Sequence, residues 1–349
     1  MTDSIERILD AAANRCREGL RVVEDYCRFI RNDPVLSEQL KKLRHQFRVA
    51  YEALPVERML ASRDTRGDVG TGITTPAETV RLSTEDLLQA NCKRIQESLR
   101  SLEEYSKVLS SSASQQFEAI RYAFYTVEQS LRLSDTLRER LQSACLYLLL
   151  TEKFCQRDWK EVAREVIAAG VDVIQLREKN ISDRELLERA RWLRDATRET
   201  STLLIINDRP DLARLVDADG VHVGQDELPV TQVRQLLGSR PLIGLSTHNS
   251  TQVEEAVALQ ADYIGVGPVF PSRTKSFADF PGLEFVRNVQ STLGETLPWF
   301  PIGGVTAELL PELLAAGALR VAVCEAILGQ PHPGETVQQW KALLGGNAG

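Results

Sequence analysis

The chain has 349 residues, of which 43% are hydrophobic and 26% charged, and its formal net charge is −7. This length and composition predict a globular protein with room for a barrel-sized domain and an additional smaller one. The acidic balance argues against a nucleic acid or an anionic membrane surface as the main partner. No apolar run approaches the roughly 20 residues of a membrane helix. The first six residues lack the basic and apolar regions of a secretory signal.

The six cysteines form no CxxC pair and have no metal-ligand spacing with the four histidines. This usage is typical of reduced thiols in a cytoplasmic protein. We therefore expect a cytoplasmic location, with small molecules as partners and neither nucleic acid nor membrane. The sequence is compatible with a homo-oligomer but does not specify one.

The first part of the chain, residues 1–135, predicts an all-α helical domain. Its apolar residues recur at three- and four-residue steps, as on one face of a helix. Asn32-Asp33-Pro34 ends the first helix, and a long polar loop over residues 62–76 separates the second from the third. The expected helices cover about residues 3–32, 35–54, 84–109 and 114–133, which is typical of a four-helix unit. The sequence does not state the role of this domain.

The helical domain contains an internal repeat, because residues 17–26 align without gaps on residues 96–105. The two segments share Glu, Leu, Arg, Glu and Tyr at equivalent positions. The Glu and Arg of each segment, three residues apart, lie on one helix face. Ordinary surface pairing is one interpretation, and a paired Arg/Glu site across a pseudo-twofold axis is the sharper one. The pattern predicts two helical hairpins related by duplication.

The second part, residues 136–349, predicts an α/β domain with the (β/α)8 TIM-barrel fold. Short apolar runs alternate here with helical segments, and eight such runs in roughly 200 residues favour a barrel. A doubly wound sheet is the alternative, but no GxGxxG follows the first strand. The expected strands are Leu146–Leu150, Val171–Leu176, Leu203–Ile206, Gly220–Val223, Leu242–Leu245, Tyr263–Val266, Trp299–Ile302 and Arg320–Val323.

Charged and polar residues follow the second of these strands. Gln175-Leu176-Arg177-Glu178-Lys179 stands where a buried strand should emerge from the sheet. Parallel α/β folds bind their ligands at this carboxyl end of the strands. A solvated turn is the alternative for one such segment taken alone. The recurrence of polar residues at other strand ends favours a binding cleft.

Acidic residues follow the third and fourth strands. Asn207-Asp208 ends the third strand, and Asp226-Glu227 comes shortly after the fourth. Carboxylates at neighbouring strand ends suit Mg²⁺, which keeps several waters and bridges to substrate phosphates. Taken singly, Asp208 fits a turn before a proline, and either later acid fits a helix cap. Their pairing favours a metal site.

Two further segments predict phosphate binding. The loop after the sixth strand contains Ser272-Arg273-Thr274-Lys275, whose hydroxyl and cationic groups suit phosphate oxygens. Gly303-Gly304, after the seventh strand, offers bare N–H groups near a helix start, although such a pair is also ordinary turn chemistry. No Ser/His/Asp order and no thiol with a basic neighbour stands out. The site is therefore suited to electrostatic stabilisation of phosphorylated groups and not to covalent catalysis.

These motifs, in this order, resemble the thiamine-phosphate synthase family of (β/α)8 enzymes across about residues 145–345. The resemblance implies that the stretch Gln175, Leu176, Arg177, Glu178 and Lys179 holds the pyrimidine diphosphate. The remaining implied roles are substrate binding by Asn207 and Ser246, magnesium binding by Asp208 and Glu227, thiazole-phosphate binding by Ser272, Thr274 and Gly304, and diphosphate binding by Lys275, with Arg273 in the same loop. The family commonly has Asp at the position of Glu227, which leaves open whether Asp226 or Glu227 reaches the ion. A family serine in the last strand is replaced by Cys324.

The resemblance implies a transferase that joins an aminomethylpyrimidine diphosphate to a thiazole phosphate, with Mg²⁺ as the cofactor. Arg177, Lys179 and Lys275 would stabilise the departing pyrophosphate in a dissociative substitution. A thiazole-phosphate tautomerase is the alternative within the same barrel type, but it needs neither the metal pair nor Lys275. A third possibility is a non-catalytic barrel that senses thiazole phosphate. The helical domain has no part in the resemblance and looks like an extension fused to some of these enzymes.

Overall fold

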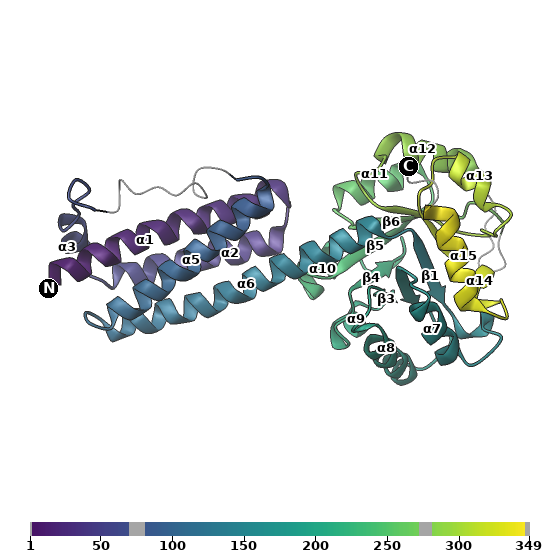
Figure 1. Ribbon diagram of the computed structural model, residues 1–349, viewed down its shortest axis with the longest axis horizontal. Helices are drawn as coiled ribbons and strands as arrows, with labels where there is room; N and C mark the ends of the chain where they lie inside the picture. Colours follow the sequence, from purple (N-terminus) through teal and green to yellow (C-terminus); the bar gives the residue numbers. More distant parts are fainter. Residues whose placement is uncertain (1, 70–80, 272–280, 346–349) are drawn as a thin grey trace. The chain divides into compact units, whose positions relative to one another are not determined.

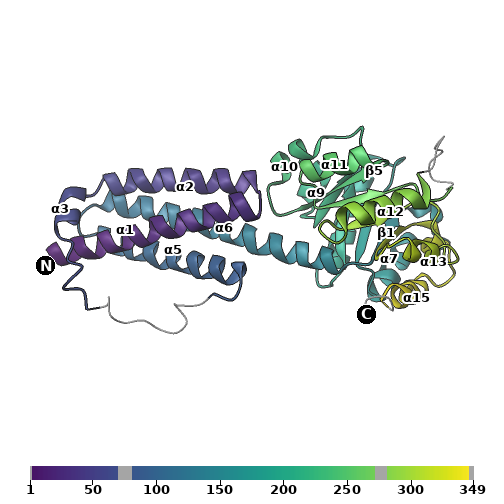
Figure 2. The same cartoon turned by 90° about the horizontal axis from the view of Figure 1, so that it is seen from above.

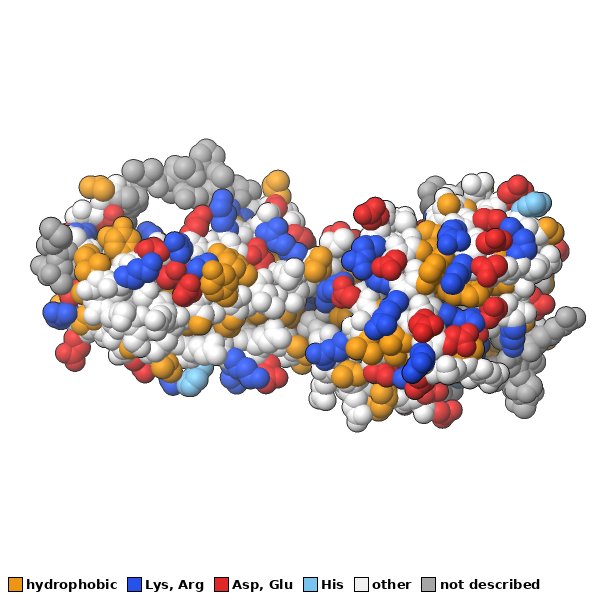
Figure 3. Space-filling view, turned by 90° about the horizontal axis from the view of Figure 1, so that it is seen from below, with side chains coloured by type: hydrophobic (Ala, Val, Ile, Leu, Met, Phe, Trp, Pro, Cys, Tyr) orange, Lys and Arg blue, Asp and Glu red, His pale blue; other side chains and the backbone are white. Residues whose placement is uncertain are grey.

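The structure is a computed structural model that describes residues 2–69, 81–271 and 281–345. It divides into two compact units, Met1–Arg132 and Leu133–Gly349. Helix α6 (Ser111–Ser143) contributes residues to both units, and the boundary expected from the sequence at residue 135 falls inside it. Within the described ranges, no helix is both long enough and apolar enough to span a bilayer. On the face shown in Figure 3, acidic and basic side chains are interspersed over each unit.

The first unit is all-helical, as predicted, and α1, α2 and α5 run side by side in it (Figure 2). Its core consists of the apolar stripes expected from the sequence, including Leu9, Phe47, Leu99 and Phe124. A short helix was not predicted, because six residues hold too little of the helical period. The elements are α1 (Thr2–Asp25), a π-helical turn (Tyr26–Ile30), α2 (Pro34–Glu52), α3 (Val56–Ala61), α5 (Thr84–Ser106) and the first part of α6. The predicted loop over 62–76 lies outside the described residues from position 70 onward.

The internal repeat has a structural counterpart in two buried carboxylates. Glu24 and Glu103 stand at equivalent positions of the repeat, and both are nearly inaccessible to solvent. Each pairs with an arginine of the helix that follows, Glu24 with Arg44 and Glu103 with Arg121 at 2.7 Å. Equivalent helices therefore make equivalent ion pairs, and this supports the predicted duplication of a helical hairpin.

The second unit contains eight parallel strands in a nearly closed barrel (Figure 1), which confirms the predicted fold. Hydrogen-bonded pairs connect the strands in the order β7-β6-β5-β4-β3-β2-β1-β8. Their near-continuous burial follows from their Val-, Ile- and Leu-rich sequences. The strands are β1 (Leu146–Leu150), β2 (Val173–Leu176), β3 (Leu203–Asn207), β4 (Gly220–Val223), β5 (Leu242–Thr247), β6 (Tyr263–Val266), β7 (Trp299–Pro301) and β8 (Val321–Val323).

Helices alternate with these strands and cover the barrel. Their buried residues pack on the outward side chains of the strands in one continuous core. The helices are α7 (Trp159–Ala168), α8 (Asp183–Thr197), α9 (Pro210–Leu215), α10 (Val230–Leu237), α11 (Ser250–Ala258), α12 (Gly282–Leu293), α13 (Leu310–Ala315), α14 (Glu325–Leu328) and α15 (Pro333–Gly345). A 3-10 turn over Glu152–Phe154 follows β1. The end of α6 closes the amino-terminal side, where Leu137 and Leu141 join the inward-facing core of the strands.

Three aspartates at the amino-terminal side of the barrel make the same kind of hydrogen bond to a neighbouring strand. Each stands directly before an even-numbered strand, and its carboxylate accepts a hydrogen bond from the backbone of the preceding odd-numbered strand. The bonds join Leu146 N to Asp172 at 2.9 Å, Leu204 N to Asp219 at 2.8 Å, and Ile243 N to Asp262 at 2.8 Å. Each carboxylate also pairs with a cation, for example Lys341 at 2.6 Å from Asp172. These bonds fix the strands whose opposite ends carry the site.

Candidate active site

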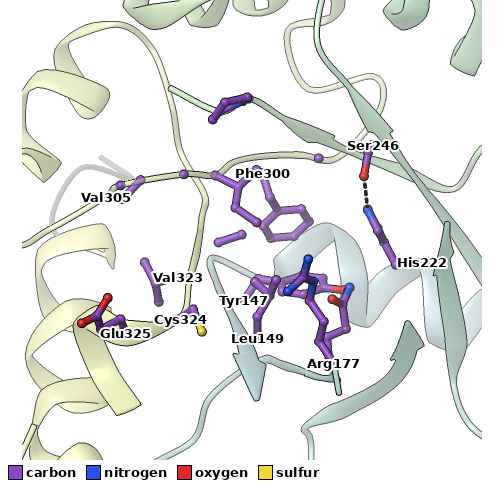
Figure 4. A pocket seen from close by; sticks show the side chains of 18 of the residues that line it. Tyr147, Leu149, Arg177, His222, Ser246, Phe300, Val305, Val323, Cys324 and Glu325 are labelled. Atoms are coloured by element: carbon purple, nitrogen blue, oxygen red, sulfur yellow. Dashed lines mark hydrogen bonds between the residues drawn. The ribbon is translucent and has the colours of Figure 1, made fainter. Parts of the chain in front are cut away.

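A cavity of about 610 Å³ lies at the carboxyl ends of the barrel strands. Figure 4 shows side chains from several strands around it, with Arg177 and His222 on one side and Val305 and Glu325 on the other. Of the site residues expected from the sequence, it is lined by Gln175, Arg177, Lys179, Asn207, Asp208, Glu227, Ser246 and Gly304. Residues separated by up to 129 positions thus meet in one cavity because parallel strands end on the same side of the barrel.

Strand alternation decides which residues after β2 reach the cavity. Gln175 and Arg177 line it, and the Arg177 backbone is held by Leu150 O at 2.9 Å and by the Thr151 hydroxyl at 2.8 Å. Leu176 points outward into the apolar core between strands and helices. The structure thus does not bring Leu176 into the cavity wall, and its substrate-binding role stays a prediction.

Glu178 also lies outside the cavity wall. Its carboxylate accepts a hydrogen bond from the Glu152 backbone at 2.7 Å and contacts the Arg189 guanidinium at 3.2 Å. Burial raises the pKa of Glu178 above its ordinary value, because desolvation disfavours the charged form. The structure gives this side chain partners within the protein, and its role as a substrate ligand stays a prediction.

Asn207 and Asp208 present a linked amide and carboxylate at the end of β3. The Asn207 side chain donates to Asp208 Oδ2 at 2.5 Å, and the Asp208 backbone N–H donates to His222 O at 2.8 Å. Asp208 has a φ of +59°, a left-handed conformation that Asp adopts more readily than most residues. This conformation ends the strand and places the Asp208 carboxylate in the cavity wall.

The second acidic position is occupied by Glu227, which lines the cavity, whereas Asp226 does not. Among the described residues, no group of three or more His, Cys, Asp and Glu side chains is arranged to hold a metal by itself. Two carboxylates in one cavity nevertheless fit Mg²⁺, which takes few protein ligands and completes its shell with waters and substrate phosphates. The donor set present here therefore suits that ion.

Glycine is required in the segment after β7. Gly304 has a φ of +63°, and a Cβ at this position would lie 2.3 Å from the carbonyl oxygen of Pro271. The preceding Gly303 has a φ of +100° and its carbonyl accepts a bond from Phe270 N at 3.0 Å. Glycine is therefore needed here for two reasons, the positive φ angles and the close approach of the loop that follows β6. The predicted partners Ser272, Arg273, Thr274 and Lys275 lie outside the described residues.

Several residues of the cavity wall were not assigned a role from the sequence, and Tyr147, His222 and Tyr263 are among them. These three form the floor of the cavity beneath Ser246 and Gln175. His222 Nε2 lies 3.0 Å from Ser246 Oγ, the pair joined by a dashed line in Figure 4. Burial raises the pKa of both tyrosines, so their hydroxyls stay protonated at neutral pH. The signal available in the sequence was their position on inward-facing sites of the strands.

No described cysteine of the cavity is prepared to act as a nucleophile. Cys324, in the cavity wall after β8, has its pKa raised to about 12 by burial. A thiol in that state carries little thiolate at neutral pH. This agrees with a site that acts through binding and charge.

Comparison with known proteins decides the family. Residues 146–327 match the family model described as thiamine monophosphate synthase. A curated relative from Rhodopirellula baltica, named thiamine-phosphate synthase, is 44% identical over 338 residues, which cover 95% of this chain and 90% of the relative. The chain belongs to the thiamine-phosphate synthase family. Enzymes of this family are transferases of thiamine biosynthesis.

Other members support the same conclusion. The thiamine-phosphate synthase of Synechocystis is 40% identical over 336 residues, covering 96% of this chain and 95% of the relative. A solved thiamine phosphate pyrophosphorylase from Pyrococcus furiosus has a TM-score of 0.55 and 30% identity, and covers 61% of this chain and all of that protein. Residues 7–130 match a second model, the ThiD2 family. The ThiD2 match thus falls on the helical unit, and the thiamine monophosphate synthase match falls on the barrel.

Proposed function

We propose that this chain joins 4-amino-2-methyl-5-(diphosphooxymethyl)pyrimidine to a thiazole phosphate, giving thiamine phosphate and pyrophosphate. The observation that carries the proposal is the meeting of Arg177 and Lys179 with Asp208 and Glu227 in one cavity. Two cations and two carboxylates around a common space suit a diphosphate and its accompanying divalent ion. We assign the reaction to residues 136–349. The thiazole substrate is the phosphoethyl thiazole or its carboxylate, and the carboxylate would in addition release carbon dioxide and take up a proton from water at the carbon that loses it.

The reaction is a substitution at the pyrimidine methylene carbon. The bond from this carbon to the bridging oxygen of the diphosphate breaks, and the electron pair leaves with the pyrophosphate. The thiazole nitrogen then supplies the electron pair of the new C–N bond. No side chain needs to remove or deliver a proton in these steps. This matches a cavity whose described thiol is protonated and whose charged groups are mainly suited to binding.

The work of the protein is to bind the departing pyrophosphate more tightly as its charge develops. Arg177 offers a fork of N–H donors that matches phosphate oxygens, and the half-buried position of its side chain strengthens that interaction. Lys179 adds a second cation at the more exposed edge of the same wall. We expect Lys275 to act with them from the loop after β6.

Magnesium is the cofactor that the family implies, and Asp208 and Glu227 are the residues that would hold it. When bound, the ion would neutralise charge on the leaving pyrophosphate. Asn207 supports this arrangement, because its amide donates to the Asp208 carboxylate and restricts its orientation. Gln175 on β2 and Ser246 on β5, the strands on either side of β3 and β4, remain available for the pyrimidine.

The test is to incubate the purified protein with both substrates and saturating Mg²⁺ and to measure thiamine phosphate and pyrophosphate. We expect the two products in equal amounts. A protein that binds thiazole phosphate yet forms neither product would be a sensor or a tautomerase, and would contradict the proposal. Omission of each substrate in turn is the control for contaminating activities.

A further inference from the structure

Five polar side chains form a continuous hydrogen-bonded series across the floor of the cavity. Gln175 Nε2 lies 2.8 Å from the Tyr147 hydroxyl, which lies 3.0 Å from the Tyr263 hydroxyl. The Tyr263 hydroxyl is 3.3 Å from His222 Nδ1, and His222 Nε2 is 3.0 Å from Ser246 Oγ. These residues come from β2, β1, β6, β4 and β5, so the series crosses the barrel from one side to the other.

The barrel is built to make room for this series. A Cβ at Gly244 would lie 2.1 Å from Tyr263 Cζ and 2.5 Å from His222 Nδ1, so only glycine fits beside the two rings. Tyr147 and Tyr263 are each almost completely buried, with 2% and 1% exposure, and pack on Phe300. Buried hydroxyls so confined have few alternative partners.

The series has one direction in which every hydrogen of its buried hydroxyls is used, and it starts from the Gln175 amide. The Gln175 amide nitrogen can only donate, so the Tyr147 oxygen accepts and its single hydrogen is left for Tyr263. The Tyr263 hydrogen in turn finds an acceptor at His222 Nδ1 when that nitrogen carries no hydrogen, and this is the arrangement that uses every hydrogen of the two buried hydroxyls. We therefore assign the ring hydrogen to Nε2, from which it is donated to Ser246 Oγ.

The two ends of the series consequently differ in character. Gln175 Oε1 is buried and has no hydrogen-bond partner among the described residues, so it can accept a hydrogen bond from a ligand. Ser246 Oγ accepts from His222, and its own hydrogen remains for a group in the cavity. A ligand that satisfies both ends must bring an N–H donor to Gln175 and an acceptor to Ser246.

We propose that Tyr147, Tyr263 and His222 are positioning residues that impose this direction and thereby select the amino form of the pyrimidine over its oxo form. The inference rests on the proposed function, because it takes the pyrimidine diphosphate as the ligand of this wall. The exocyclic amino group supplies the N–H donor, and the ring nitrogens and diphosphate oxygens supply acceptors. A 4-oxo pyrimidine, as its lactam, has an acceptor at position 4 and its hydrogen on a ring nitrogen, so the donor is lost from the position where the amino compound offers it to Gln175 Oε1.

The first test is Tyr263→Phe, which removes one hydroxyl and keeps the ring. Calorimetric titration with the 4-amino and 4-oxo pyrimidine diphosphates, without thiazole, gives the ratio of the two Kd values. We expect the preference for the amino compound to fall at least about tenfold, because the Gln175 amide is then free to turn around. Tyr51→Phe, which removes a hydroxyl in the helical unit, should leave the ratio unchanged. An unchanged ratio in Tyr263→Phe overturns the proposal, and Tyr147→Phe repeats the test at a second hydroxyl.

The second test needs no variant for its main result. In ¹⁵N-histidine-labelled full-length protein, the two ring-nitrogen shifts of neutral His222 report which nitrogen carries the hydrogen, with His222→Asn identifying the signal. The proposal requires hydrogen on Nε2, and hydrogen on Nδ1 overturns the direction assigned above.

Both tests are independent of turnover. Absence of product with an altered Kd ratio would refute the proposed function alone, and normal turnover with an unaltered ratio would refute this inference alone.

Discussion

The Glu178 carboxylate lies 3.2 Å from the Arg189 guanidinium, although Glu178 is flanked by Arg177 and Lys179 of the cavity wall. Both side chains of this pair are about 10% exposed, and the same Glu178 oxygen accepts the Glu152 N–H at 2.7 Å. The pair ties the segment after β2 to α8 and to the turn after β1. Glu178 thus anchors the segment that carries the two cations.

Substitution of Glu178 separates this anchoring from substrate binding. Glu178→Gln keeps an oxygen for the Glu152 N–H, so we expect the KM for the pyrimidine diphosphate to change by less than about twofold. Glu178→Ala removes that acceptor and should lower the free energy of unfolding by about 1–3 kcal/mol in urea titrations. A tenfold rise of KM in Glu178→Gln would instead identify the carboxylate as a substrate ligand.

Arg177 should be essential for turnover. Arg177→Ala removes a cation from the diphosphate wall, and we expect kcat/KM to fall about a hundredfold, or about 3 kcal/mol of transition-state stabilisation. Arg184→Ala is the matched control, because this arginine is exposed on α8 and is not part of the cavity wall. Steady-state kinetics of the two variants, with thermal unfolding to confirm folding, test the assignment. Equal activities in the two variants would remove Arg177 from the mechanism.

The metal assignment distinguishes two adjacent acids. Asp208→Asn and Glu227→Gln should each raise the Mg²⁺ concentration for half-maximal activity at least about tenfold, because each removes one charge from a two-carboxylate site. Asp226→Asn should leave that concentration unchanged, since Asp226 is not in the cavity wall. Titration of activity with Mg²⁺ measures all three. A shift in Asp226→Asn and none in Glu227→Gln would exchange their roles.

Gly304 and Gly282 allow backbone strain to be separated from steric conflict. Their φ angles are +63° and +65°, but only at Gly304 would a Cβ meet another loop, at 2.3 Å from Pro271 O, whereas nothing lies within 4 Å at Gly282. We expect Gly282→Ala to cost about 1–2 kcal/mol of stability. Gly304→Ala should cost more and should raise the KM for the thiazole phosphate. Equal stability losses and an unchanged KM would show that the loop moves aside without consequence.

Asp262 should make the barrel sensitive to acid. Burial alone would raise its pKa, but Arg234 and Arg138 outweigh burial and hold the pKa below the ordinary value of 3.8. A carboxyl group whose pKa is lowered by folding stabilises the fold fully when the pH is above its pKa in the unfolded chain. This stabilisation is lost as the pH falls through the lower pKa of the folded state. We expect Asp262→Asn to lower the free energy of unfolding by about 3 kcal/mol at neutral pH. The difference from the unsubstituted protein should shrink in acid, and a difference independent of pH would contradict the linkage.

The barrel could be predicted because its signals are local. Each apolar run between helical segments became a strand. Leu146–Leu150, Gly220–Val223 and Tyr263–Val266 have the expected bounds, and the other strands differ by one or two residues at one end, as for Val173–Leu176 against the expected Val171–Leu176. The extension of α6 to Ser143 could not be predicted in this way. Leu137 and Leu141 find their partners on β-strands far along the chain, including Phe300, and only that packing gives the last turns of the helix a buried face.

The candidate site also has a part that local sequence signals predict and a part that depends on contacts between distant segments. Strand ends place Arg177, Asp208 and Glu227 near one another once a parallel barrel is assumed, so the cavity wall followed from the sequence. The floor did not, because Tyr263 and His222 meet only through the register that pairs His222 with Gly244 and Gly244 with Tyr263. Likewise, the orientation of Glu178 depends on Arg189, which belongs to another element.

The aspartates before β2, β4 and β6 have a consequence for the connectivity of the chain. Each bonds to the strand immediately before it in the sequence, so β1 with β2, β3 with β4 and β5 with β6 behave as two-strand modules. A circularly permuted chain that is reopened between modules, after α8 or after α10, keeps every such bond within one continuous segment. Reopening inside a module separates an aspartate from the strand that it caps. The barrel therefore offers preferred places for new termini, and they alternate around the ring.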